Sequence, residues 1–151
     1  MLKKLLILTF ITTISFANIL KIGDTLTPFS IPDQFDELHT INSEKYQTVI
    51  VSFSKESSTK VNDFLQKQEK HFLKNNNIVY ISDIHKMPSI ITWLFALPKM
   101  KKFNYKVMLL YKENTVFPQN NNDLSIIRFK NNKVSSIEFI KENESIDSIF
   151  N

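Results

Sequence analysis

The stretch Thr48–Val61 (TVIVSFSKESSTKV) constrains the fold of this chain more than any other part of the sequence. Its first residues are continuous, β-branched and apolar, which is typical of a strand buried on both faces of a parallel sheet. The polar segment Ser54–Ser58 follows, and a helical pattern begins after it. We expect the hydroxyl of Ser57 or Ser58 to cap this helix by accepting a hydrogen bond from a backbone N–H.

The helical pattern is followed by a second apolar segment, which predicts a strand–helix–strand unit. Asn75–Asn77 ends the helix, and Ile78–Ile81 is expected to form the second strand. The crossover of about 25 residues predicts a right-handed parallel unit. The apolar residues expected on one face of the helix are Val61, Phe64, Leu65 and Phe72.

The C-terminal half adds three further strands. Lys106–Tyr111 is expected to form a strand, and Ser125–Phe129 and Val134–Ile140 a hairpin. The linking Asn131-Asn132 tolerates the positive φ that a two-residue turn requires. Glu142–Phe150 predicts a short terminal helix.

The segment that leads into the first buried strand is extended rather than helical. Lys21–Gln34 contains Pro28 and Pro32, and both favour extended or edge-strand backbone. Leu38–Ile41 is then expected to be a short return strand. These residues predict an N-terminal hairpin that covers part of the sheet.

The composition fits one folded domain. The 151 residues are 42% hydrophobic and 12% aromatic, which is enough for a core and excludes a disordered chain. The single glycine, Gly23, excludes a glycine-rich phosphate-binding loop. The chain has no cysteine, so it has no disulfide to stabilise it and no thiol to react.

Residues 1–17 are expected to be a signal peptide. A basic region that ends at Lys4 precedes the apolar run Leu5–Phe16, and Ala17 completes a small-residue cleavage pattern. An uncleaved anchor is the alternative, but the run is short for a spanning helix, which needs about 20 residues. We expect cleavage after Ala17, a periplasmic location and a domain of residues 18–151.

The mature chain has little net charge. Removing Lys3 and Lys4 from the 19 basic residues leaves 17 against 15 acidic residues, a net charge of +2. Such an excess is too small for a nucleic-acid-binding footprint. No segment after the first 17 residues is long enough to span a membrane.

In the order of these elements, the chain resembles the thioredoxin-like superfamily, and within it the peroxiredoxin and periplasmic thiol–disulfide branch. The entry segment Ile22–Gln34 is similar to that branch's opening G-D-x-x-P-x-F-x-L-x-D. Val49–Phe53 resembles its core strand, and Ile126–Val134 its late hairpin. The resemblance covers most of the mature chain. It implies an α/β three-layer fold with a central mixed sheet, helices on both faces and an N-terminal β-hairpin.

The positions at which the family carries its cysteines hold other residues. The thioredoxin pattern places the two cysteines at Ser58 and Val61. The peroxiredoxin pattern places a threonine at Thr59, which is present, but Asn62 stands where the peroxidatic cysteine belongs. The thiolate nucleophile is therefore absent in either alignment.

The family's cis-proline is missing as well. It would precede the late hairpin, where this chain has Asn122-Asp123, and Pro118 lies several residues too early. Thiol–disulfide oxidoreductase and thiol peroxidase activities are therefore not expected. The chain is most similar to exported, cysteine-less members of the superfamily whose function is unknown.

Two loops offer other chemistry. A hydroxyl of Ser57–Thr59 would be a nucleophile if a base lay nearby, and a helix cap otherwise. The loop Asp83–Met87 alternates three possible metal ligands, Asp83, His85 and Met87. Soft copper sites usually combine thiolates or several Met and His, so the ordinary interpretation is that Asp83 caps a turn. We assign no cofactor, no catalytic residue and no metal ligand.

The segment Ile90–Leu97 is apolar at seven of eight positions, with Pro98 expected to kink or restart the helix. A helix that is apolar all round is either fully buried or covered by something else. In the second case Trp93, Phe95 and Met100 would form an interaction surface, because aromatic residues and methionine are enriched at interfaces.

Two functions remain open. The first is a non-catalytic binding or assembly factor with a protein partner in the periplasm, which keeps the scaffold for recognition. The second is a metal carrier, for copper, or an enzyme without a thiol that uses Ser57–Thr59 or Asp83–Met87.

Overall fold

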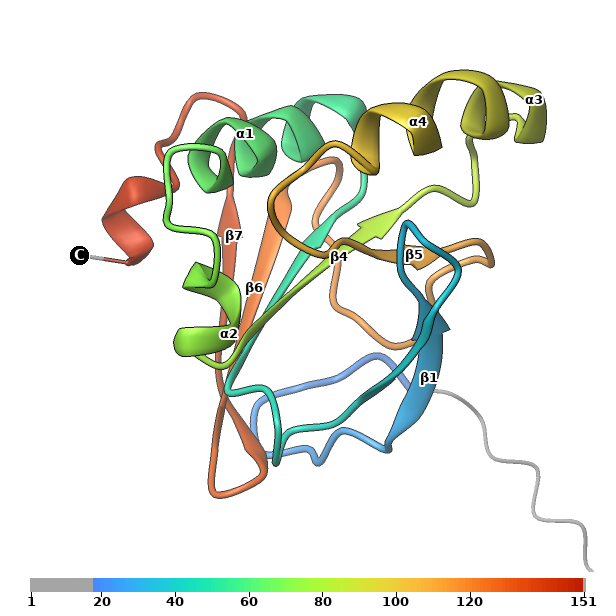
Figure 1. Cartoon of the computed structure of the whole chain (residues 1–151). Helices are drawn as coiled ribbons and strands as arrows, with labels where there is room; N and C mark the ends of the chain where they lie inside the picture. Colours follow the sequence, from blue (N-terminus) through green and yellow to red (C-terminus); the bar gives the residue numbers. More distant parts are fainter. Residues whose placement is uncertain (1–17, 151) are drawn as a thin grey trace, which may run out of the picture.

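The computed structural model describes residues 18–150, so the expected signal peptide lies outside the described residues. Five strands form a mixed sheet in the order β5-β4-β3-β6-β7, and two more form an N-terminal hairpin (Figure 1). The strands are β1 (Phe29–Pro32), β2 (Leu38–Ile41), β3 (Thr48–Ser52), β4 (Ile78–Asp83), β5 (Met108–Leu110), β6 (Leu124–Lys130) and β7 (Lys133–Ile140). The α-helices are α1 (Lys55–Leu65), α2 (Phe72–Asn75), α3 (Ser89–Ile91) and α4 (Leu97–Met100).

Strand β3 lies at the centre of the sheet, as its apolar sequence predicts. It pairs in parallel with β4, where Val49 lies opposite Val79, and antiparallel with β6, where Val49 lies opposite Ile127. The residues at 49–51 are fully buried. The predicted parallel strand–helix–strand unit is therefore confirmed.

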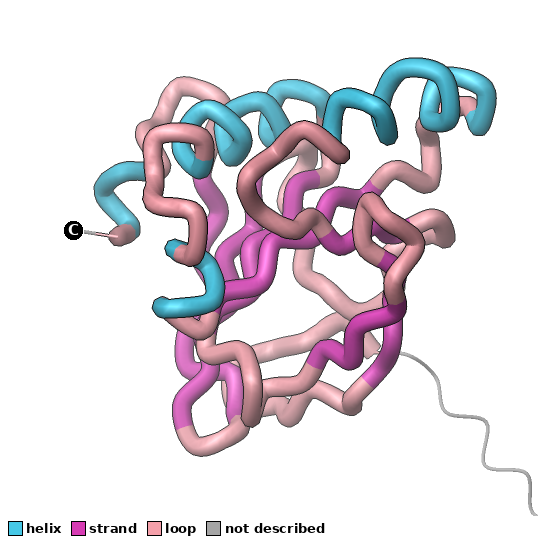
Figure 2. The backbone as a smooth tube through the Cα atoms, in the orientation of Figure 1, coloured by secondary structure: helices cyan, strands magenta, loops and turns pink. Residues whose placement is uncertain are grey.

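Alternate residues of the strands enter two separate hydrophobic clusters. Val49 and Val51 face one cluster, and Ile50 faces the other, as the two-residue period of a strand requires. The helices α1, α2 and α4 pack on the Ile50 side. The N-terminal hairpin and the loop that contains Phe117 pack on the Val49 side (Figure 2).

The observed layers therefore differ from the expected ones in one respect. The mixed sheet and the N-terminal hairpin are confirmed, but the helices of the described chain contribute to the cluster on one face only. On the other face Phe29 and Phe117 pack with ring centroids 5.9 Å apart and take the place of a helix layer.

Helix α1 begins earlier than expected. Ser54, not Ser57 or Ser58, is the N-cap, and its hydroxyl accepts a hydrogen bond from the Ser57 N–H. Ser57 completes a capping box, because its own hydroxyl accepts from the Ser54 N–H. The helix also ends earlier, at Leu65. Phe72 belongs to α2 and still packs edge-on against Phe64.

The strand boundaries are shifted in two places. β4 extends to Asp83, whereas β5 is limited to Met108–Leu110 and pairs only with residues 81–83 of β4. The β6–β7 turn is as predicted, with φ of 52° at Asn131 and 62° at Asn132. The expected terminal helix is reduced to a 3₁₀ turn, Asp147–Ile149.

Residues 89–100 form a helical arm in which the α-helix restarts at Leu97, beside Pro98, as expected. The π-helical turn Thr92–Ala96 joins α3 to α4, and Pro98 lies in the first turn of α4, where no backbone N–H is needed. Figure 1 shows α3 at the outer end of this arm, beyond the strands. No helix in residues 18–150 is long and apolar enough to cross a membrane.

Candidate functional site

The hydroxyls at the start of α1 are engaged in internal hydrogen bonds. Ser58 Oγ donates to Ser52 Oγ at 2.9 Å and lies 3.4 Å from Ser82 Oγ. Ser52 Oγ also lies 3.0 Å from the phenol of Tyr80. Burial raises the pKa of Tyr80, and the three serines offset this effect only in part. The four side chains therefore form a neutral polar network in the core.

This network lacks the partner that a hydroxyl nucleophile requires. Thr59 Oγ1 donates to the Lys55 carbonyl at 2.9 Å, and Ser57 Oγ donates to the Ser54 carbonyl at 3.2 Å. Within the described chain, no histidine or carboxylate hydrogen-bonds to Ser57, Ser58 or Thr59. The geometry is that of helix capping and core packing, not of an activated serine.

The side chains at the other positions that were compared with the family also pack or form hydrogen bonds within the fold. Val61 is fully buried in the hydrophobic cluster that contains Ile50 and receives α1, α2 and α4, called the helix-side cluster below. The amide oxygen of Asn62 accepts a hydrogen bond from Tyr105 at 2.8 Å. Ser54 Oγ reaches the Asn122 carbonyl at 3.4 Å, so Asn122 does lie beside the start of α1. No peptide bond in residues 18–150 is cis.

The loop proposed as a metal site brings two of its three candidate ligands together. Asp83 Oδ1 and His85 Nδ1 lie 2.6 Å apart, and Asp83 also accepts from the His85 N–H, which is the turn cap expected of it. Met87 packs against the helix-side cluster. Among the described residues, Asp83 and His85 are not part of any cluster of three ligating His, Asp or Glu side chains.

A second polar cluster, which no sequence pattern predicts, lies at the tip of the N-terminal hairpin. The Asp33 carboxylate is fully buried and accepts from His39 Nε2 at 2.8 Å and from the backbone N–H groups of Phe35 and Glu37. Lys106 Nζ lies 3.0 Å from Asp33 and 2.5 Å from Glu37.

The two carboxylates of this cluster share one ammonium group, that of Lys106. Burial raises the pKa of Asp33, but the hydrogen bonds from Lys106, His39 and two backbone N–H groups outweigh it and lower the pKa overall. Asp33, Glu37 and His39 are close enough to bind a cation. The Lys106 ammonium already contacts both carboxylates, so the cluster is complete as an ion-pair network.

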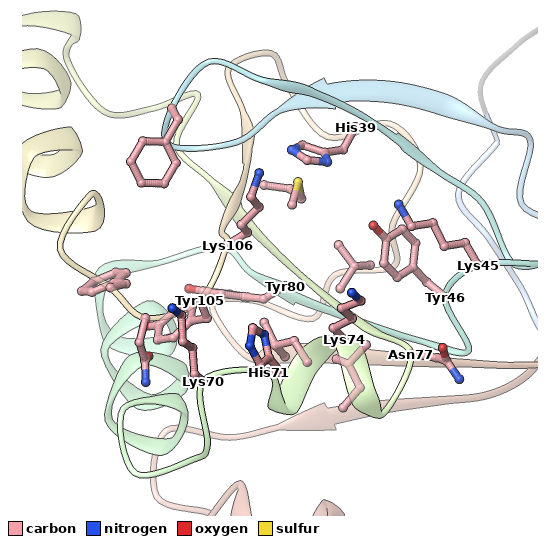
Figure 3. A pocket seen from close by; sticks show the side chains of 17 residues that line it. His39, Lys45, Tyr46, Lys70, His71, Lys74, Asn77, Tyr80, Tyr105 and Lys106 are labelled. Atoms are coloured by element: carbon pink, nitrogen blue, oxygen red, sulfur yellow. The ribbon is translucent and has the colours of Figure 1, made fainter.

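A large cavity in the described chain opens beside this cluster. It has a volume of about 710 Å³ and lies at the edge of the sheet, next to residues 78–80 of β4. β5 pairs only with residues 81–83, so its late start leaves this part of the β4 edge without a neighbouring strand. Figure 3 shows His39 on one side of the cavity and His71 and Lys74 on the other.

The lining of the cavity is apolar and basic. Its apolar residues are Phe35, Leu73, Ile78, Val79, Phe103 and Met108, and its basic residues are His39, Lys45, Lys70, His71, Lys74 and Lys106. No aspartate or glutamate is among the lining residues. Lys106 is neutralised by Asp33 and Glu37, whereas the other lysines make no ion pair within residues 18–150. The cavity is therefore suited to an anion with an apolar body.

Of the three residues expected to form an interaction surface, two are exposed and one is half-buried. Trp93 and Phe95 are 71% and 65% exposed on the helical arm. Met100 is half-buried and packs against the helix-side cluster. The neighbouring Ile90 and Leu94, which are not among the expected surface residues, are exposed as well.

No protein-family model matches this sequence, and no curated protein matches it. Solved structures do match. A putative protein disulfide isomerase from Bacteroides thetaiotaomicron is 17% identical with a TM-score of 0.53, and the match covers 80% of each chain. A peroxiredoxin-like protein from Aquifex aeolicus is 12% identical with a TM-score of 0.52 over 87% of this chain and 84% of that one.

A third match is BsSco, described as a member of the Sco family of cytochrome c oxidase assembly proteins. It is 17% identical with a TM-score of 0.52, over 87% of this chain and 92% of that one. Such low identities show the fold alone. The chain has a thioredoxin-like fold, as its sequence predicts, and because it contains no cysteine the thiol chemistry of redoxins is impossible in it.

Proposed function

We propose that this protein is a non-catalytic binding protein whose ligand is an organic anion with an apolar body, held in the cavity beside β4. The observation that carries the proposal is the lining: an apolar floor, a rim of basic side chains and no acidic residue. The start of α1, where redoxins carry their thiol, supports the non-catalytic part of the proposal. The hydroxyls of Ser54 and Ser58 there are engaged in structural hydrogen bonds.

The cavity offers separate contacts for the two parts of such a ligand. The floor, formed by Leu73, Ile78 and Met108, removes apolar surface from water, which drives binding without regard to direction. Lys70 and Lys74 stand at the exposed rim, next to α2, where an anionic group would stay partly hydrated. A volume of about 710 Å³ is in the range of sites for drug-sized ligands.

The bare edge of β4 adds a possible polar anchor inside the apolar floor. The Ile84 N–H donates to the Leu110 carbonyl on the β5 side. Because backbone groups alternate along a strand, those of Ile78 point to the same side, before the first residue of β4 that pairs with β5 in residues 18–150. A carbonyl, amide or carboxylate of the ligand would pair with this edge.

The expected export signal gives the proposed site of action. The basic, apolar and small-residue pattern of residues 1–17 supports secretion, and we propose that the protein works in the periplasm. The mass of the protein recovered from a periplasmic fraction tests this step. A chain that begins at Asn18 is the expected result, and an intact Met1 in the cytoplasmic fraction would contradict it.

Binding is best tested with a matched pair of probes, dodecyl sulfate and dodecyltrimethylammonium, below their micelle concentrations. Titration calorimetry of residues 18–151, which contain both hydrophobic clusters, should show tighter binding of the anion. Lys70→Gln with Lys74→Gln should weaken that binding about tenfold, because two rim charges are lost. Equal affinity for the two probes would contradict the proposal.

Two control variants separate the cavity from other apolar or basic surfaces. Lys130→Gln with Lys133→Gln removes the same charge at the β6–β7 turn and should leave binding unchanged. Leu73→Trp should fill the cavity and abolish binding without changing the charge. Leu94→Glu, on the exposed arm, should have no effect, and a loss there would move the site from the cavity to the arm.

A further inference from the structure

The helical arm, residues 89–100, has an inverted arrangement of polar and apolar side chains. Thr92 faces inward, is 3% exposed, and donates a hydrogen bond to the Pro88 carbonyl. The large exposed apolar side chains of the arm are Ile90, Ile91, Trp93, Leu94 and Phe95. A surface helix normally turns its apolar face toward the core, so this arm is folded for an apolar environment outside the protein.

The exposed apolar side chains cover an unusually wide arc. At about 100° per residue, positions 90 to 95 without Thr92 span roughly 200° of the helix surface. A helix that binds in a protein groove presents a narrower stripe, at spacings of three and four residues. The arm also extends beyond the strands, as Figure 1 shows.

The charged side chains in the segment that contains the arm are all basic. No aspartate or glutamate occurs between Asp83 and Glu113. The exposed lysines that flank the apolar positions are Lys86, Lys99, Lys101 and Lys102, and none of them makes an ion pair within the described chain. This surface is therefore complementary to an anionic one.

We propose that the helical arm docks the protein on the surface of an anionic lipid bilayer. The apolar side chains would enter the boundary between head groups and acyl chains, and the lysines would stay at the level of the lipid phosphates. Tryptophan prefers this interfacial depth, because its ring is amphipathic. Apolar insertion and basic attraction are the two signals that stable peripheral binding requires.

A second copy of this chain fits the surface less well. A two-fold contact through the arm would bring two sets of these lysines to the rim of one interface, and the arm segment itself carries no acidic residue to neutralise them. The arm is also limited to twelve residues, about 18 Å, so it is too short to cross a membrane and suits an orientation parallel to its surface.

Trp93 makes the proposal directly measurable, since it is the one tryptophan in the sequence. Residues 18–151 are mixed with phosphatidylcholine vesicles that either contain or lack phosphatidylglycerol. With the anionic lipid, the fluorescence of Trp93 should shift to shorter wavelength, and brominated acyl chains should quench it. The protein should also co-sediment with these vesicles, and less so at high salt because the attraction is screened.

Matched variants test apolar insertion and basic attraction separately. Leu94→Glu should reduce the partition coefficient at least tenfold, whereas Leu38→Glu, at a still more exposed apolar position on β2, should leave it unchanged. Lys99→Gln with Lys101→Gln should reduce it about 25-fold, and Lys130→Gln with Lys133→Gln much less. Unchanged thermal unfolding shows that the exposed variants still fold.

Three results would overturn the proposal. The first is equal binding to vesicles with and without phosphatidylglycerol. The second is a Trp93 shift that follows protein concentration without lipid, together with a dimer in sedimentation, which assigns the arm to self-association. The third is the absence of vesicle binding while a periplasmic protein is retained by the wild type and lost with Leu94→Glu, which assigns the arm to a protein partner.

Discussion

The hydroxyl of Ser58 donates a hydrogen bond to that of Ser52, 2.9 Å away, at the position where the thioredoxin pattern places its first cysteine. Ser52 is fully buried at the end of β3, and its hydroxyl also contacts the phenol of Tyr80. The side chain at position 58 therefore points into the core of this chain. The scaffold keeps the junction between strand and helix, and a structural hydrogen-bond network takes the place of a reactive group.

A cysteine introduced at position 58 should therefore be unreactive. In Ser58→Cys the thiol would lie among Ser52, Ser82 and Tyr80, where no cation stabilises the thiolate and burial raises the pKa of the thiol. Its reaction with DTNB at neutral pH should be at least tenfold slower than that of Thr59→Cys, the exposed neighbour on the same helix. Equal rates would show that position 58 is open to solvent.

Tyr80 should make the protein sensitive to alkali. Burial raises the pKa of Tyr80 above its ordinary value of 10.0, so the folded state holds the phenolic proton more tightly than the unfolded state does. Its contribution to stability is fully present below about pH 10 and is lost as the pH rises through the folded pKa.

The measurement is the free energy of unfolding in urea between about pH 8 and pH 11. Tyr80→Phe should cost about 1 kcal/mol at neutral pH, because it removes one buried hydrogen bond, and should flatten the alkaline decline. Tyr46→Phe is the control, because its ring is only half-buried. A decline of the same slope in Tyr80→Phe would assign the alkaline sensitivity to other groups.

Asp33 should govern the stability of the protein in acid. Its pKa is lowered because hydrogen bonds from Lys106, His39 and two backbone N–H groups outweigh burial, which acts in the opposite direction. The stabilisation is present above the unfolded value near 3.8 and is lost as the pH falls through the folded pKa.

Asp33→Asn should lower the free energy of unfolding by about 3 kcal/mol at neutral pH, because Lys106 and His39 lose their buried carboxylate. Below about pH 4 the difference from the wild type should shrink. Asp36→Asn, at the exposed neighbouring turn, provides the control. A constant difference from neutral pH to about pH 2 would contradict this account.

The sequence predicts the parts of this fold that depend on local patterns. The continuous apolar residues of β3 indicate a central strand, and Asn131-Asn132 indicates the hairpin turn, because both signals lie within a few residues. The start of α1 was predicted wrongly, since three of the serines near residue 54 are able to cap a helix. The choice of Ser54 depends on its capping box with Ser57.

The candidate site could not be predicted from such patterns. The cavity exists because β5 begins opposite residue 81 rather than residue 78 of β4, which is a matter of register between distant segments. The sequence around Asp33 indicates only a turn. Its partner Lys106 is 73 positions away, so no local pattern connects the two residues. The basic and apolar residues at 70–74 were part of the expected amphipathic helix, and only the break between α1 and α2 places them at the cavity.

Gln34 connects the N-terminal hairpin to the wall of this cavity, and its loss should affect both stability and binding. Its side chain is 1% exposed, donates to the Tyr105 carbonyl at 2.9 Å, and accepts from the Val107 N–H at 2.9 Å. Gln34→Ala leaves these two backbone groups buried without their partner and should lower the free energy of unfolding by about 2–4 kcal/mol. Gln119→Ala, on an exposed loop, should change it by less than about 0.5 kcal/mol.

The same substitution should loosen the loop that carries Phe103 and Tyr105, both of which line the cavity. Dodecyl sulfate should therefore bind Gln34→Ala more weakly than the wild type under conditions in which both are folded. Gln34→Glu separates the two hydrogen bonds, because a carboxylate still accepts from Val107 but no longer donates to Tyr105. Stability of Gln34→Glu equal to that of the wild type would show that the bond to Tyr105 contributes nothing, and the connection would then depend on Val107 alone.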